Sequence, residues 1–184
     1  MLNETDLGNA KRGPALCLTL VLALLSYPPP TLAEGLTYGQ FGIGFDHPGM
    51  KKYSDVKYVE FGHMNSRGKC AYKIGGGAWI DNTGYAKKDD LFISAARESF
   101  YVNVLFGVEP KTDHFYLSYK VGPAVITHPD VLLGSMVQVS HELSFGMRDM
   151  QEVRMGMVIK HFSNGGVLSK YNEGRNFVGL EMAF

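Results

Sequence analysis

The chain ends on the stretch Asn176-Phe-Val-Gly-Leu-Glu-Met-Ala-Phe184, in which large apolar residues alternate with smaller or polar ones. Every second residue from Val178 to Phe184 is large and apolar, whereas Gly179, Glu181 and Ala183 lie between them. Successive side chains of a β-strand point to opposite faces, so this period of two predicts a strand with one apolar face.

The same period recurs upstream, for example at Phe41, Ile43 and Phe45, and it continues for about ten residues between groups of turn-forming residues. We predict an all-β protein with eight strands at roughly 36–46, 53–64, 69–80, 91–105, 114–126, 133–147, 152–163 and 176–184. The stretch 91–105 alternates poorly, so it stays open which of its side chains face outward and which face inward.

The composition agrees with a small β-protein. The 184 residues suffice for one domain, and 22 Gly with 11 Phe and 10 Tyr favour strands and tight turns over a helical bundle. The 18 basic and 18 acidic residues balance, which argues against nucleic acid as a partner. A mean hydropathy of −0.07 does not exclude the membrane, because a barrel with alternating faces averages to a similar value.

Residues 1–33 have the organisation of a cleavable secretory signal peptide. Lys11 and Arg12 precede an apolar run from Ala15 to Leu25, which is too short to span a bilayer as a helix. Cleavage after Ala33 would leave residues 34–184 as the barrel domain. Cys70 would then be the only cysteine of the exported protein, so we expect no internal disulfide.

Eight such strands fit either a soluble barrel or an outer-membrane barrel with its apolar face outward. The polar faces favour the membrane barrel, because they carry charges near the strand centres, as expected for a narrow lumen of paired charges: Glu60, Lys73, Lys120, Glu142, Arg154, Lys160 and Glu181. The last strand also resembles the closing strand of bacterial outer-membrane proteins. An even strand number places both termini in the periplasm.

Two polar residues interrupt the apolar face of the stretch 152–163. His161 and Ser163 share the face of Ile159, which in a membrane barrel faces lipid, where polar groups are costly unless they satisfy each other. The pair could be a nucleophile and its base, near the outer end of the barrel. Asn176 is expected across from Ser163 or beside it, where it could orient His161. A bulge that moves an ordinary His-x-Ser pair to the aqueous rim is the alternative.

At these residues the sequence resembles the PagL family of outer-membrane lipid A 3-O-deacylases. The matching segments are His161-Phe-Ser-Asn164-Gly-Gly166 and Asn172-Glu-Gly174-Arg-Asn176. The resemblance implies an outer-membrane serine esterase that hydrolyses the 3-O-linked acyl chain of lipid A (lipopolysaccharide) without a cofactor. It assigns Ser163 as nucleophile and His161 as general base, and it places oxyanion stabilisation at Asn164, Gly165, Gly166 and Asn172.

The third catalytic residue departs from the family pattern. The best characterised form has Glu where this sequence has Asn176, and we keep Glu173 as the alternative residue that orients His161. Lys170 and Arg175 could pair with the phosphates of lipid A. We expect no metal site, because the segment His141-Glu-Leu-Ser-Phe145 lacks the second His of a zinc motif. The alternation also places His141 on the outward, lipid-facing side, and the sequence offers no explanation for a histidine there.

Other functions stay open at this point. They are a non-catalytic structural or adhesive outer-membrane barrel, a phospholipid-directed acyl hydrolase or transferase, and a soluble secreted barrel. The sequence also leaves open whether the protein forms a homodimer.

Overall fold

The computed structural model of the chain describes residues 35–45, 56–81, 85–88, 91–94, 98–129, 133–151, 153–164 and 174–184. The expected signal peptide lies outside these residues. Among the described residues there is no helix long and apolar enough to cross a membrane.

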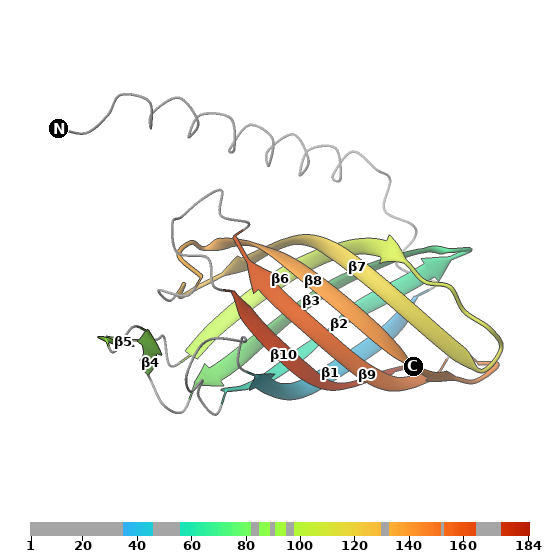
Figure 1. Ribbon diagram of the computed structural model, residues 1–184. Coiled ribbons are helices and arrows are strands. Elements are labelled where there is room, and N and C mark those ends of the chain that lie inside the picture. Colours follow the sequence, from blue (N-terminus) through green and yellow to red (C-terminus); the bar gives the residue numbers. More distant parts are fainter. Residues whose placement is uncertain are drawn as a thin grey trace, which may run out of the picture.

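Eight antiparallel strands close into one barrel in the order β1-β10-β9-β8-β7-β6-β3-β2, as predicted (Figure 1). Their bounds are β1 Leu36–Phe45, β2 Val56–Arg67, β3 Cys70–Asp81, β6 Glu98–Val108, β7 Phe115–Ile126, β8 Val137–Arg148, β9 Arg154–Ser163 and β10 Arg175–Ala183. The first and last strands pair from Tyr38 opposite Ala183 to Phe45 opposite Asn176, which leaves the barrel without an edge strand.

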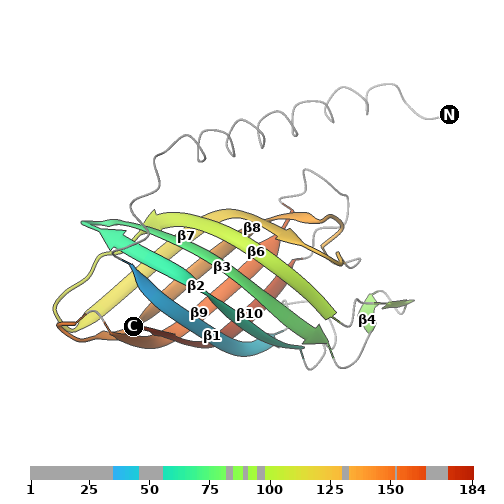
Figure 2. The same cartoon turned by 180° about the vertical axis from the view of Figure 1, so that it is seen from behind.

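The fourth predicted strand is corrected by the structure. The barrel strand here is β6, which begins at Glu98, whereas Leu91–Ser94 forms a short strand β5 that pairs with β4 (Tyr85–Lys88) in a separate two-stranded sheet. This hairpin lies beyond one end of the barrel (Figures 1 and 2). The apolar residues at 91–93 satisfy a strand pattern of their own, which explains the poor alternation across 91–105.

The two ends of the barrel differ. At one end lie Gly35, Phe184 and the connections β2–β3, β6–β7 and β8–β9; we call it the terminus end. At the other end lie the connections β1–β2, β3–β6, β7–β8 and β9–β10, and we call it the loop end. The strand ends that carry His161, Ser163 and Asn176 belong to the loop end.

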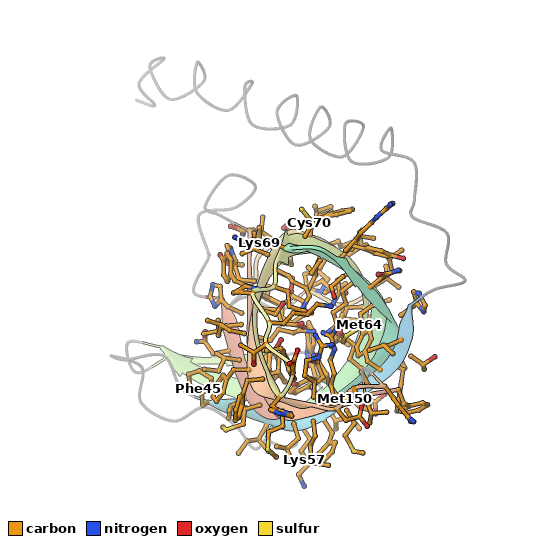
Figure 3. The ribbon with its side chains drawn as sticks, turned by 90° about the vertical axis from the view of Figure 1, so that its right-hand side faces the viewer. Phe45, Lys57, Met64, Lys69, Cys70 and Met150 are labelled. Carbon is orange, nitrogen blue, oxygen red and sulfur yellow. The ribbon has the colours of Figure 1, made fainter. Side chains whose placement is uncertain are left out.

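The two faces of the wall are as predicted, apolar outward and polar inward. Outward side chains such as Phe61 and Phe115 are 64% and 61% exposed, whereas Glu60 and Lys160 on the inner face are fully buried. Figure 3 looks along the barrel from the terminus end and shows side chains that fill its interior. An apolar exterior around a closed wall is what a bilayer requires, because no backbone group is left unpaired in lipid.

Charged side chains fill the middle of the lumen and neutralise one another. Lys73 Nζ lies 2.6 Å from Glu142 Oε2 and 3.4 Å from Glu60 Oε1, and Lys160 Nζ lies 3.1 Å from Glu142 Oε2 and also contacts Glu60. Gln40 donates to Glu181 Oε2 at 2.6 Å. Buried charges are tolerated only when they are paired, so these residues form one interdependent network.

Aromatic side chains close the lumen toward the loop end. The rings of Trp79 and Tyr101 stack with centroids 5.3 Å apart, and Phe162 meets Tyr101 edge to face at 5.0 Å. Phe177 meets Tyr58 at 5.1 Å in the same manner. Phe162 and Phe177 adjoin His161 and Asn176 along their strands, so this cluster anchors from inside the strand ends that present polar residues outside.

Candidate active site

His161 and Ser163 lie on the outward face of β9 near its loop end. Their neighbours on that face, Met157 and Ile159, are exposed, whereas Lys160 and Phe162 between them are buried in the lumen. Both polar residues are half-buried. The alternation of β9 is regular through Ser163, so the pair continues the apolar outer face.

Asn176 holds the His161 ring from the neighbouring strand. The two residues are direct partners across β9 and β10, and His161 Nδ1 lies 2.8 Å from Asn176 Oδ1. The sequence had placed Asn176 across from Ser163 or beside it, so the register is corrected toward His161. The amide oxygen can only accept a hydrogen bond, so Nδ1 carries the proton and Nε2 keeps its lone pair.

Gly174 lies against the His161 ring, and the sequence reasoning assigned it no role. Its φ is +74°, and a Cβ added there would lie 2.5 Å from His161 Cε1 and 2.8 Å from the Phe162 carbonyl oxygen. Only glycine adopts this backbone readily and also leaves space for the imidazole. The glycine of the Asn-x-Gly segment was the signal that could have identified it.

Ser163 is the last residue of β9 and lies opposite Val139 on β8. In the part of the chain that the structure describes, its hydroxyl makes no hydrogen bond to His161. The two side chains are neighbours on one face, and hydrogen bonds of this kind often shorten only when substrate binds.

Two residues expected near the substrate have different outcomes. Asn164 is 3% exposed and its amide donates to the Leu133 carbonyl oxygen at 2.8 Å, which fastens the end of β9 to the β7–β8 connection. Arg175 was expected in an outward loop on substrate phosphate, which is wrong: it begins β10, is buried, and lies 5.9 Å from the centre of the Trp79 ring. Arg175 faces inward because its neighbour Asn176 faces outward.

The remaining candidates, Gly165, Gly166, Lys170, Asn172 and Glu173, lie outside the described residues. Among the residues described, no group of three or more His, Cys, Asp or Glu side chains is placed to hold a metal ion.

The structure adds His141 and Tyr119 to the outward surface beside His161. His141 on β8 is the direct partner of His161, and the two rings have centroids 6.0 Å apart. Tyr119 Oη on β7 lies 2.8 Å from His141 Nδ1. The alternation of side chains had already predicted that His141 faces outward. Its partner Tyr119 on β7 could not be predicted without knowing the strand register.

Comparisons with known proteins find one matching family and similar solved structures. A family model described as lipid A 3-O-deacylase (PagL) matches residues 58–184. A solved structure described as the crystal structure of the outer membrane enzyme PagL is similar, with a TM-score of 0.53 and 13% identity, and the match covers 81% of this chain and 98% of that chain. The backbone structure of the Yersinia pestis outer membrane protein Ail in a phospholipid bilayer nanodisc matches with a TM-score of 0.44 and 12% identity, over 82% of this chain and 100% of that one. No curated protein sequence matches the chain.

Proposed function

Because this chain belongs to the lipid A 3-O-deacylase family of the bacterial outer membrane, we propose that it hydrolyses the ester at position 3 of lipid A with Ser163 as nucleophile and His161 as general base. The observation that carries this proposal is the 2.8 Å contact between His161 Nδ1 and Asn176 Oδ1 on the outward face. That contact fixes an imidazole beside a serine hydroxyl where neither has a structural reason to face lipid.

The hydrogen bond from Nδ1 prepares Nε2 to accept the proton of Ser163. The Ser163 Oγ attacks the ester carbonyl, the proton moves to His161 Nε2, and the tetrahedral intermediate then expels the sugar oxygen, which takes that proton. Water hydrolyses the acyl-enzyme by the same route and releases a 3-hydroxy fatty acid. No cofactor takes part in these steps.

Asn176 is the third member of this catalytic group, with Glu173 as the alternative. A neutral amide fixes the ring and its tautomer, but it stabilises the imidazolium less than a carboxylate does. We therefore expect an enzyme that is slower than one with Glu at this position.

The oxyanion donors are assigned to the segment after β9. The backbone N–H groups of Gly165 and Gly166 and the side chain of Asn172 are the candidates for binding the developing charge. Asn164 supports them indirectly, because its amide ties the start of this segment to Leu133. Lys170 stays a candidate partner for a substrate phosphate.

A catalytic residue on the outer wall suits an amphiphilic substrate. Lipid A that diffuses laterally in the outer leaflet reaches the wall without leaving the membrane, and its acyl chains lie along exposed side chains such as Ile159 and Leu180. In this arrangement the loop end of the barrel faces the outer leaflet.

Mass spectrometry of lipid A from a Gram-negative host that expresses the full chain tests the proposal. We expect loss of one 3-hydroxyacyl group with the parent protein and no loss with Ser163→Ala or His161→Ala. His114→Ala is the matched control, because His114 is exposed in the β6–β7 connection at the terminus end, and it should retain activity.

Two results would contradict the proposal. Unchanged lipid A with a barrel that migrates as folded on a gel would exclude deacylation, and activity that persists in Ser163→Ala would exclude the nucleophile. Loss of acyl chains from phospholipids instead of lipid A would favour a phospholipid-directed hydrolase.

A further inference from the structure

Two imidazoles, not one, are oriented on the outward surface. His161 contacts Asn176 through Nδ1 at 2.8 Å, and His141 contacts Tyr119 through Nδ1 at the same distance. Within the described residues, Nε2 of neither ring makes a hydrogen bond. Two ring nitrogens are thus available on neighbouring strands at one site.

His141 and Tyr119 lie on the membrane side of the nucleophile. Ser163 ends β9, whereas His161 lies two residues before it and is level with His141 on β8. Tyr119 is the direct partner of Leu143, which lies two residues farther from the loop end than His141. The polar groups therefore extend from Ser163 down into the apolar face of the wall.

The surroundings of this pair are apolar. Val121 and Leu143 flank it on β7 and β8 and expose 36% and 37% of their surface on the outward face. The Tyr119 hydroxyl and the His141 imidazole form one hydrogen bond with each other, through Nδ1 of the ring. The other ring nitrogen, Nε2, has no hydrogen-bond partner among the described residues. An uncompensated polar atom at this depth is costly unless it has a ligand.

We infer that Tyr119 and His141 form a subsite that binds a hydroxyl group carried on the scissile acyl chain, a few carbons from the ester. The inference rests on the proposed function, which places the ester carbonyl at Ser163. Sugar and phosphate oxygens then lie beyond the loop end, and only the acyl chain runs down the wall past His141. A polar subsite there can select only a chain that carries a polar substituent.

The selection follows from hydrogen bonding. A hydroxyl group on the acyl chain can form a hydrogen bond with His141 Nε2. An unsubstituted acyl chain cannot, so the hydroxylated substrate gains one hydrogen bond. Such a gain is worth about tenfold in rate or affinity.

Rates with two matched substrates test the inference in detergent micelles. The substrates are synthetic lipid A analogues that carry at position 3 either a 3-hydroxyacyl chain or the unsubstituted chain of the same length. We expect Tyr119→Phe and His141→Leu to lower kcat/KM about tenfold for the hydroxylated substrate and less than about twofold for the other. Phe115→Leu is the control, because Phe115 is exposed on the same strand as Tyr119 near the terminus end.

An equal loss with both substrates would overturn the subsite and make the pair a support for His161. Unchanged rates in both variants would overturn it as well. If the parent protein hydrolyses neither substrate, the proposed function fails, and a binding measurement then decides the subsite independently.

That binding measurement uses folded Ser163→Ala protein with ¹⁵N-labelled histidine. Methyl 3-hydroxytetradecanoate should shift the ring nitrogen resonances of His141, methyl tetradecanoate should not, and Tyr119→Phe should abolish the difference. Equal responses to the two esters would overturn the subsite.

Discussion

Phe162 and Phe177 meet edge to face inside the barrel, with ring centroids 6.0 Å apart, directly behind His161 and Asn176 on its outer wall. The two contacts share the same pair of strands, so the packing inside fixes the spacing of the polar residues outside. A change in the packing of Phe162 and Phe177 inside should therefore also move His161 and Asn176 on the outer surface.

Phe177→Ala should lower the free energy of unfolding by about 3–5 kcal/mol, because it leaves a cavity among Tyr58, Trp79 and Phe162. Urea unfolding followed by Trp79 fluorescence measures the change, since Trp79 lies 5.7 Å from Phe177. Phe145→Ala, which truncates an outward ring that is 41% exposed, is the control and should cost far less. A similar loss in both variants would show that the cluster contributes no special stability.

Asn176→Glu should raise kcat about tenfold, because a carboxylate at Nδ1 stabilises the imidazolium that forms during attack. Asn176→Leu should lower kcat by at least about tenfold, since the ring loses the acceptor that fixes its tautomer. Initial rates of lipid A deacylation measure both changes. Equal activity of the parent and both variants would exclude Asn176 as the residue that orients His161.

Gly174→Ala should abolish most activity, because its Cβ would lie 2.5 Å from His161 Cε1 and displace the ring. Gly68→Ala separates this clash from backbone strain: Gly68 also has a positive φ, +62°, but an added Cβ meets nothing within 4 Å. Both variants should lose about 1–2 kcal/mol of stability, and only Gly174→Ala should lose activity. Parallel thermal unfolding and rate measurements check this, and an equal loss of activity in both would contradict it.

Glu142→Leu should destabilise the barrel by about 3–5 kcal/mol, because it leaves buried ammonium groups without their shared counter-ion. Lys73 and Lys160 lie 2.6 and 3.1 Å from Glu142 Oε2, and Lys120 lies 3.8 Å from Oε1. Adding Lys73→Met to Glu142→Leu should recover part of the loss, since it removes the excess positive charge that Glu142→Leu leaves in the lumen. Unfolding in urea measures the three proteins, and a double variant less stable than Glu142→Leu would contradict the network.

The sequence predicted the barrel well because alternation is local information. A period of two fixes which side of a strand each residue takes, so the outward His161 and the inward Lys160 followed without further data. The β4–β5 hairpin was missed because the apolar residues 91–93 lie just before the barrel strand β6 and were assigned to it, although the stretch 91–105 alternates poorly.

Register was harder to predict, because it depends on connection lengths and on how the whole barrel closes. That is why Asn176 was expected across from Ser163 or beside it, whereas it lies across from His161, two residues earlier on β9. For the same reason the contact between Tyr119 and His141 could not be predicted. Arg175 is different: its parity relative to Asn176 already indicated the lumen, and the assignment to a loop obscured it.

His161 and Ser163 lie on the convex outer wall of the barrel. Under the proposed function the protein therefore contacts the substrate from one side only. Neighbouring lipids form the opposite wall, exclude water from the ester and press the acyl chain against β7, β8 and β9. The order and thickness of the bilayer should then change the rate of hydrolysis. Selectivity measured in detergent should differ from selectivity in the membrane, and a water-soluble substrate mimic would lack the second wall that holds it in place.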